Sequence, residues 1–320
     1  MDDFMKKIVS FMVLGLSIYM TPVAFAESAK LTGDISVKYE RDTADGSPNI
    51  FGTMSTFKLK AEKDLGAGWS LYARLGAQYA TQPTLADYNL DAYGEDKKSV
   101  VALDQWGVTY NSGQLIYKIG RQDVSVGTTA LLYSRSDGNI GTKTFADGLT
   151  AVGTIGAAEI ATLLVKEDNA GIQDNKIYAI RVGYNRAANL NYGLTLGRYQ
   201  DSINGSTNHW AVDGKYKFGS NSLTAEYTKS SSSTDNKGYV ATWDYSFNDK
   251  TEAYITGFKV ETNGDMGKQS DFDNDNRGFY YGITHKLSDT DILEFVYKNQ
   301  KNISSGQNNN KFEATISREF

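Results

Sequence analysis

The chain of 320 residues contains no cysteine, only 3 prolines and only 2 histidines. An exported protein without cysteine has no disulfides, so its stability must come from another source. Proline cannot donate a hydrogen bond to a β-ladder, and its scarcity leaves long stretches of the chain able to form strands. After residue 20, no apolar run is long enough to cross a bilayer as a helix. The sequence therefore excludes a disulfide-stabilised domain and indicates no transmembrane helix.

The first 26 residues have the layout of a secretory signal peptide. Lys6 and Lys7 form a short basic region, residues 8–20 are mostly apolar, and residues 24–26 read Ala-Phe-Ala, which fits an A-x-A cleavage site. The apolar run is too short to span a bilayer, which disfavours the alternative of an N-terminal membrane anchor. We therefore predict that residues 1–26 are cleaved and that residues 27–320 form the mature chain.

Apolar and polar residues alternate along many segments. In residues 69–79 the odd positions read W, L, A, L, A and Y, and the even positions read S, Y, R, G and Q. The same period of two runs through residues 210–218 and 239–247. Such alternation gives a strand one apolar and one polar face, whereas a helix would scatter these residues around its circumference.

The alternation predicts an all-β protein with sixteen strands, most of them long enough to cross a membrane. A tilted strand needs roughly 9–11 residues to cross the hydrocarbon core, and strands of soluble domains are mostly shorter. The strands are expected at residues 29–41, 54–65, 69–81, 100–111, 114–122, 146–156, 157–167, 176–187, 190–201, 208–218, 222–230, 238–248, 251–262, 277–287, 291–301 and 311–320.

The links between these strands alternate in length. Short links rich in Gly, Asn, Asp and Ser follow the even-numbered strands, as at residues 65–68, 111–114 and 219–221. Long polar links follow the odd-numbered strands, at residues 42–53, 82–99, 123–145, 168–175, 202–207, 231–237, 263–276 and 302–310. Outer-membrane barrels have short periplasmic turns and long external loops, so this sorting predicts an even-stranded, antiparallel transmembrane β-barrel.

The last strand ends in an aromatic residue on its apolar face, Phe320, in line with Phe312, Ala314 and Ile316. Together with the signal peptide, the strand count and the sorted links, this ending resembles the Gram-negative general porin family over the whole of residues 27–320. In that family the terminal aromatic residue helps the barrel-assembly machinery to recognise its client. The resemblance implies a 16-stranded, trimeric barrel with an inward-folded third loop.

The resemblance also implies a function. A general porin is a passive, water-filled diffusion channel for ions and small hydrophilic solutes in the outer membrane of a diderm bacterium. Its partners are outer-membrane lipids and two further copies of the same chain. The resemblance implies no enzymatic activity, no cofactor and no metal, and no basic run interleaved with aromatic residues suggests binding of nucleic acid.

The longest link, residues 123–145, is the candidate constriction loop. Loops of this length without their own structure are uncommon and often functional. It follows residues 118–123 (Lys-Ile-Gly-Arg-Gln-Asp), which resemble the strand end that opens the constriction loop of general porins. The apolar residues 131–133 would be a liability on an exposed loop, so an inward fold is expected, the alternative being an ordinary external loop. The acidic tip of the best-known porins is absent, which leaves Asp123 and Asp137, with Asp147 as a further candidate.

Basic residues gather on the polar faces of neighbouring predicted strands and oppose these acids. A basic wall facing an acidic loop would create a transverse field that orients dipolar solutes. The alternative is that the charges are simply solvated lumen residues without selectivity, and the sequence does not decide between cation and anion preference. Alternation places on this basic wall Lys38, Lys58, Lys60, Arg74 and Lys118. The resemblance implies that Arg121, at a strand end, also lies in the pore, and the loop adds Arg135 with the acidic residues Asp123 and Asp137 to the proposed pore-lining set.

Other functions have weaker support. A substrate-specific channel would carry an aromatic slide or a dense ladder of lumen charges, and neither is seen in the sequence. An outer-membrane enzyme with a histidine-based triad would have to use His209 or His285 with a nearby serine and acid. A closed structural or adhesive barrel is the third alternative. Residues 271–275 have the spacing of a calcium loop but lack its glycine and its final glutamate, and we interpret them as a solvated loop, the alternative being a weak divalent-cation site.

The apolar faces of early and late strands differ in composition. Late strands carry many aromatic residues, as expected at a lipid interface, whereas the first three strands carry mostly small and aliphatic residues, which allow close approach of another wall. We therefore predict that the strands at residues 29–81, with the last strand beside them, face partner barrels. The strands at residues 208–287 are expected to face lipid.

Overall fold

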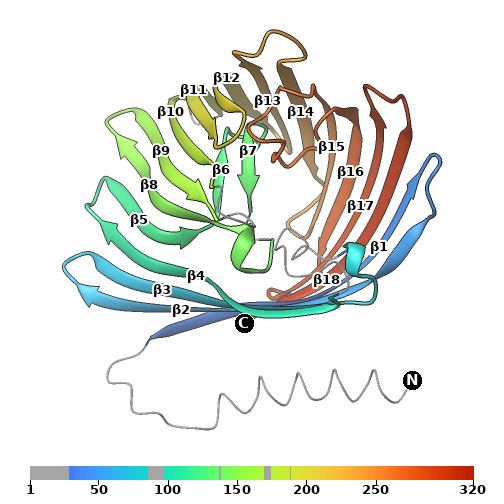
Figure 1. Cartoon of the computed structure of the whole chain (residues 1–320). Helices are drawn as coiled ribbons and strands as arrows, with labels where there is room; N and C mark the ends of the chain where they lie inside the picture. Colours follow the sequence, from blue (N-terminus) through green and yellow to red (C-terminus); the bar gives the residue numbers. More distant parts are fainter. Residues whose placement is uncertain (1–28, 86–96, 137, 169–173, 188) are drawn as a thin grey trace, which may run out of the picture. The chain divides into compact units, whose positions relative to one another are not determined.

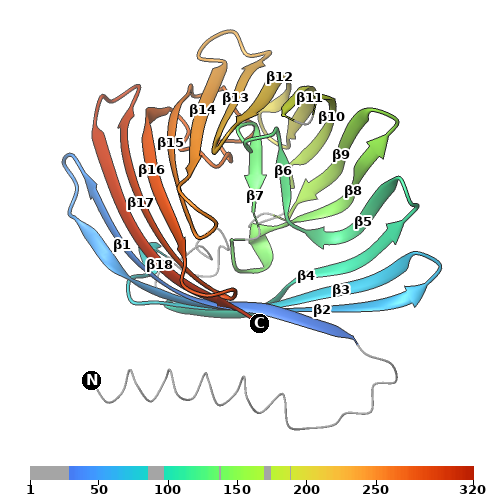
Figure 2. The ribbon, with the colours of Figure 1, turned by 180° about the vertical axis from the view of Figure 1, so that it is seen from behind.

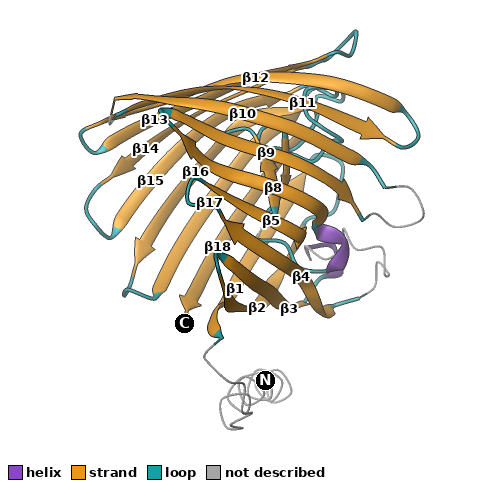
Figure 3. Cartoon of the chain, turned by 90° about the vertical axis from the view of Figure 1, so that its left-hand side faces the viewer, coloured by secondary structure: helices purple, strands orange, loops and turns teal. Residues whose placement is uncertain are grey.

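In the computed structural model, residues 29–85, 97–136, 138–168, 174–187 and 189–320 are described, and sixteen antiparallel strands within them close into one barrel. Figures 1 and 2 show this ring from opposite sides, and Figure 3 shows the strands running obliquely across the wall. The strands are β1 (Lys30–Ala44), β2 (Ile50–Gly66), β3 (Trp69–Ala80), β4 (Ser99–Asn111), β5 (Leu115–Gln122), β8 (Ala146–Ile155), β9 (Ala158–Glu167), β10 (Lys176–Ala187), β11 (Leu190–Asp201), β12 (Gly205–Phe218), β13 (Asn221–Ser230), β14 (Lys237–Ser246), β15 (Thr251–Val260), β16 (Asn276–Lys286), β17 (Asp291–Asn302) and β18 (Asn308–Glu319).

The predicted strands are confirmed, with ends that differ from the sequence-based ones by at most 4 residues. Each strand pairs with its neighbours in the chain, and β1 pairs with β18 to close the ring, with Val37 opposite Ile316. Two short strands escaped prediction because three residues give too little pattern: β6 (Val124–Val126) and β7 (Tyr133–Arg135). They form a separate two-stranded sheet in the link between β5 and β8. Within the described ranges, no helix is long and apolar enough to cross a membrane.

The two faces of the wall follow the alternation. In β12, Trp210 and Val212 expose 40% and 45% of their surface on the outside, whereas Ala211 and Asp213 are buried on the inside. The outer face therefore offers apolar side chains to its surroundings. Such a face is stable only against another apolar phase, so it is typical of a membrane barrel.

A tight turn joins β2 to β3 and requires an unusual backbone. Gly66, Ala67 and Gly68 have φ values of 83°, 52° and 82°, which lie in the left-handed region that favours glycine. A Cβ at Gly68 would lie 2.5 Å from the backbone oxygen of Asn111, whose own amide donates to Gly68. The two glycines therefore fix the register of β2 and β3 at this end of the barrel.

β4 contains an irregularity that the sequence pattern signals. Its register against β3 shifts after Leu103, so that Asp104 and Gln105 are both buried on the inside while Leu103 and Trp106 are exposed outside. A β-bulge of this kind inserts one extra residue and re-aims a side chain. Here it directs the carboxylate of Asp104 into the barrel.

The interior holds the link that contains β6 and β7. We call residues 124–145, apart from residue 137, the inner segment. In both Figures 1 and 2, β6 and β7 lie within the ring of strands. One buried apolar cluster joins this segment to the inward side chains of β9–β12, so this part of the core lies between the segment and the wall.

Candidate pore constriction

The inner segment is held against the wall by its apolar residues. Leu131, Leu132 and Tyr133 are fully buried. Leu132 and Tyr133 belong to a cluster with Leu163 of β9 and Ile177 of β10. Leu131 belongs to a second cluster on the inner faces of β14–β16. Burial of each such side chain is worth about 1.5–3 kcal/mol, so the segment is bound tightly to one side of the lumen.

A second loop covers the inner segment from β15. We call residues 261–275 the covering loop. Its backbone exchanges hydrogen bonds with the segment: the amide of Met266 donates to Leu132 over 2.7 Å, and the amide of Ser134 donates to Gln269 over 2.6 Å. Met266 is itself fully buried in the apolar cluster. The two loops therefore form one packed layer.

One carboxyl group of the covering loop is buried in this layer. Asp265 accepts a hydrogen bond of 2.8 Å from the side chain of Asn274, and its second carboxylate oxygen has no partner. Burial raises the pKa of Asp265 to about 7, because desolvation disfavours the charged form. The layer thus contains a group that titrates near neutral pH.

Arg135 and Arg74, both predicted to line the pore, are instead buried. Arg135 donates to the backbone oxygens of Lys143 and Phe145 (2.9 and 3.2 Å) and lies 3.5 Å from Glu167. It fastens β7 to the C-terminal end of the inner segment and to Glu167 at the end of β9. The correction follows from packing, since Arg135 is 4% exposed and so does not face open water.

Arg74 lies beneath the inner segment. Its guanidinium makes a bidentate pair with Asp104 (2.8 and 2.7 Å), donates to the backbone oxygen of Asn139 and lies over the ring of Phe145. It is 1% exposed. Alternation predicts correctly that Arg74 points inward, but it does not predict that a loop covers it. Asp104 was missed, although the change of parity between Leu103 and Trp106 signals the bulge that turns it inward.

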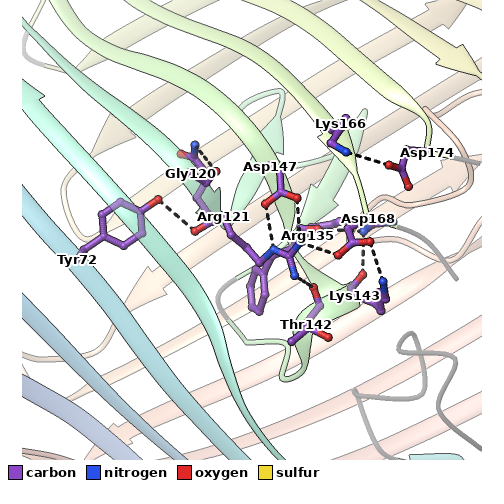
Figure 4. A network of polar contacts seen from close by, with 12 residues as sticks. Tyr72, Gly120, Arg121, Arg135, Thr142, Lys143, Asp147, Lys166, Asp168 and Asp174 are labelled. Carbon is purple, nitrogen blue, oxygen red and sulfur yellow. Dashed lines mark hydrogen bonds and ion pairs between the residues drawn. The ribbon is translucent and has the colours of Figure 1, made fainter. Parts of the chain in front are cut away.

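Arg121 stands at the centre of a polar cluster where β5 ends (Figure 4). Its side chain pairs with Asp147 and Asp168 (2.8 and 2.6 Å) and donates to the backbone oxygen of Thr142. Lys143 also pairs with Asp168, over 2.7 Å. Although partial burial raises the pKa of Asp168, the hydrogen bonds from Lys143 and Arg121 outweigh it and hold that pKa below its usual range. Asp168 was not among the predicted residues, because it belongs to a distant link.

Lys118 and Asp123 come together rather than facing each other across the pore. The ammonium of Lys118 lies 2.9 Å from Asp123 and over the ring of Tyr72. Asp123 keeps 41% of its side chain exposed. Asp137, the other predicted acid, lies outside the described residues. The acidic side of the predicted constriction is therefore represented by Asp123, with Asp147 engaged by Arg121.

The inner faces of β1, β2, β17 and β18 carry interleaved charges. Lys38 pairs with Glu40 (2.9 Å) and Glu313 (3.5 Å), and Lys58 lies 3.6 Å from Asp34. Lys60 lies opposite Arg74 in the register of β2 and β3. Lys298 and Lys311 contribute further pairs with Glu313 and Glu40. The predicted basic patch is thus a mixed array of both signs.

The two histidines do not form the arrangement of a catalytic triad. The imidazole of His209 is buried with its Nε2 atom 2.9 Å from the hydroxyl of Thr207, and His285 contacts the hydroxyl of Thr251 at the same distance. Within the described ranges, neither ring pairs with a carboxylate, and no three acidic or histidine side chains gather as a metal site would require.

The fold resembles those of known porins. No protein-family model and no curated protein matches the sequence. Among solved structures, a triple mutant of the Rhodopseudomonas blastica porin matches with a TM-score of 0.60 and 10% identity, covering 92% of this chain and 100% of its own. Salmonella typhi OmpF in complex with daunomycin matches with a TM-score of 0.62 and 12% identity, covering 91% of this chain and 97% of its own. The chain therefore has the porin fold.

Proposed function

We propose that this protein is a passive, water-filled channel of the bacterial outer membrane that admits ions and small hydrophilic solutes. One observation carries the proposal: a closed ring of sixteen strands with an apolar outer and a largely polar inner face. Barrels of about 16–18 strands enclose an aqueous channel, whereas barrels of eight are filled by their own side chains. A barrel enzyme is disfavoured by the contacts of His209 and His285.

The test is the conductance of the purified protein in planar bilayers. We expect stepwise current increases on insertion, with conductance roughly proportional to salt concentration, because ions would cross in water. A protein that inserts fully folded but passes no current would contradict the channel and favour a closed structural barrel.

The residues of the constriction follow from the contacts described above. Lys38, Lys58 and Lys60 on β1 and β2 would line the opening together with Lys118, Arg121 and Asp123 at the end of β5, which lies three strands from β2 in the ring. Arg74 and Arg135 would act as anchors of the inner segment rather than as pore-lining charges. The narrowing would thus arise from the packed layer of two loops, and the charges at its free edge would tune the passage of ions.

The orientation in the membrane is supported by the outer face of the wall. At the end of the barrel with the long links, outward-facing cations lie directly opposite each other: Lys166 and Lys176, Lys229 and Lys237, Lys259 and Arg277. Like charges in such positions destabilise a sheet unless anionic groups lie nearby. Asp174 and Glu261 pair with Lys166 and Lys259 over 3.0 and 2.6 Å, which leaves the row with an excess of cations. We infer that this edge lies among anionic headgroups of the outer leaflet, with the long links outside.

Two experiments test this placement. A protease site inserted in residues 263–276 should be cut on intact cells, and one inserted at residues 219–221 should not; the reverse pattern would invert the barrel. N-terminal sequencing of the exported protein should begin at Glu27 if residues 1–26, which lie outside the described residues, are a signal peptide. A start elsewhere would contradict that cleavage site.

We further infer a homotrimer that buries the early strands. Leu31, Val37 and Leu71 are exposed on the outer face of β1–β3, whereas β12–β16 expose Trp210, Tyr239, Trp243 and Phe279. In mild detergent, native electrophoresis should reveal a trimer that Ala73→Arg weakens, since this residue follows the outward parity of Leu71. Ala253→Arg, on the outer face of β15, is the matched control and should leave the trimer intact. A monomer at every protein concentration would contradict the proposal.

A further inference from the structure

The lumen contains a recess that adjoins the proposed constriction at Lys118 and Asp123 and extends beyond it. A cavity of about 660 Å³ extends from residues 123–128 to the short link between β10 and β11. Its walls are the inner faces of β5 and β8–β12 and one side of β6. Ligand pockets in proteins typically measure about 300–1,000 Å³, so the recess has the size of a binding site for a small solute.

The floor of the cavity is a fixed network of polar side chains. Arg181 makes a bidentate pair with Asp213 (2.9 and 2.6 Å) and donates to Asn191 (3.2 Å). Asn191 and Asn185 donate to the two carboxylate oxygens of Glu159 over 2.8 and 2.6 Å. Each charge in this network is already satisfied, so the network orients groups at its surface and does not act as an open charge.

Glycines make room for this floor. A Cβ at Gly183 or Gly193 would lie 2.5 or 2.6 Å from the guanidinium of Arg181. The guanidinium therefore lies flat across both glycines, along the wall, and leaves the space above it free. Because a Cβ at either position would displace Arg181, these glycines maintain the cavity.

Two cations of the cavity have no such partners. Lys215 and Lys217 line it from β12, and in the described part of the chain neither ammonium group forms a hydrogen bond or an ion pair. Lys215 lies directly opposite Asn191 in the register of β11 and β12. Two uncompensated ammonium groups beside a row of carboxamides are suited to an anionic group that also presents hydroxyls.

A second, independent observation points to a ligand. Thr195 lines the cavity with 1% of its surface exposed, and its hydroxyl oxygen has no hydrogen-bond partner. A buried hydroxyl without a partner costs about 1–3 kcal/mol, so such groups are normally satisfied by something that binds there. Val126 and Leu163 offer an apolar patch on the opposite side.

We propose that this cavity binds a small hydroxyl-bearing carboxylate, the chemistry of a sugar acid. The carboxylate lies between Lys215 and Lys217, its hydroxyls bond to Asn191 and Thr195, and its C–H groups contact Val126 and Leu163. The inference deepens the proposed channel function, because it gives the pore a preferred class of solute.

Calorimetric titration of the folded protein in detergent tests the site, with gluconate as the probe and sorbitol as its uncharged counterpart. We expect saturable binding of gluconate and none of sorbitol. Lys215→Gln/Lys217→Gln should weaken gluconate binding at least about tenfold, because two charge-assisted contacts are lost. The matched control Lys286→Gln/Lys298→Gln removes two inner-wall lysines of β16 and β17 and should bind as the unaltered protein does.

Thr195→Val tests the unpartnered hydroxyl without changing charge or shape. It should weaken gluconate binding several-fold and leave the barrel as stable as before or more so. Absence of gluconate binding to the unaltered protein, or equal loss in both lysine pairs, would overturn the proposal. The titration does not depend on ion flow, so a conducting pore that fails to bind gluconate refutes this site alone, and a folded barrel without conductance refutes the channel alone.

Discussion

The inner wall of the barrel differs between its two sides. Near the long links of β9–β15, apolar side chains such as Leu163, Ile177 and Phe258 point inward and are buried beneath the inner segment and the covering loop. Along β17, β18, β1 and β2, the inward side chains are charged and paired, as with Lys38 and Glu313. An inner face must be polar only where water reaches it, so the apolar side marks where protein has replaced water.

This difference explains how a loop of this length stays in place. The covered side contributes apolar burial, which is non-directional and insensitive to salt, and fixes the backbone through a few hydrogen bonds. The uncovered side contributes ion pairs in contact with water, which are individually weak and respond to salt. Mutations on the two sides should therefore differ in size and in salt dependence.

The largest expected effect comes from removing most of the inner segment, which covers the apolar side of the wall. Deletion of residues 128–140 should raise single-channel conductance several-fold, because the layer that narrows the lumen is lost. The apolar face of β9–β15 would then meet water, so the thermal stability of the barrel should fall as well. Deletion of residues 303–306, in the link between β17 and β18, is the control and should change neither. An unaltered conductance with a folded barrel would place the narrowing elsewhere.

The next effect compares one charge from each side. Arg74→Met leaves the carboxylate of Asp104 buried without its cation and should destabilise the barrel by about 3–5 kcal/mol, whereas Lys58→Met, which breaks a pair in contact with water, should cost at most about 1 kcal/mol. Urea unfolding in detergent micelles measures both. Adding Asp104→Leu to Arg74→Met should recover much of the loss. Equal costs for Arg74→Met and Lys58→Met would mean that the two sides do not differ in solvation.

These contrasts also define what the sequence could predict. Alternation identified the barrel strands because a membrane barrel must present one apolar and one polar face along its whole length. The same reasoning placed Lys38, Lys58 and Arg74 on the inside. It could not tell that Arg74 is buried, because parity gives the direction of a side chain and says nothing of what covers it.

The sequence does indicate which strands are covered by the inner segment, because alternation between apolar and polar residues fails there. Residues 163–165 read Leu-Leu-Val, so both faces of β9 are apolar there. Val240 and Phe258 likewise put apolar side chains on the inner face of β14 and β15. The partners of Arg121 were less accessible, since Asp168 follows β9 in a separate link, and only the pairing of β5 with β8 and of β8 with β9 brings the two side chains together.

A smaller effect should follow from pH on the covered side. The pKa of Asp265, raised by burial to about 7, means that the folded protein keeps this proton while the unfolded chain loses it near pH 4. The folded state then binds more protons than the unfolded one, so stability should fall between about pH 4 and 7 and level off above, by an amount on the order of a few kcal/mol. Beyond its intrinsic pH dependence, hydrogen exchange of the covering loop should therefore quicken as pH rises from about 4 to 7 and show no further change above that.

The control for this prediction is Asp265→Asn. The side-chain oxygen of the asparagine can still accept the hydrogen bond from Asn274, but the amide group cannot ionise. Its covering loop should exchange at a rate that shows no step near neutral pH beyond the intrinsic chemistry. If the variant and the unaltered protein follow the same profile, another group governs the loop.

The smallest effect should come from neutralising charge on the uncovered side. Lys58→Gln/Lys60→Gln removes two cations from the wall that faces water, so reversal potentials in a salt gradient should shift modestly toward cation preference. The shift should shrink in concentrated salt, because the screening length falls to roughly 3 Å at 1 M.

Arg74→Gln removes a cation from the same neighbourhood, opposite Lys60, but beneath the inner segment. Provided that it folds, its reversal potential should stay close to that of the unaltered protein, because Asp104 and the cover separate it from the ion path. A shift from Arg74→Gln as large as that from the lysine pair would mean that ions pass beneath the inner segment, and the distinction between a covered and an uncovered side would not hold.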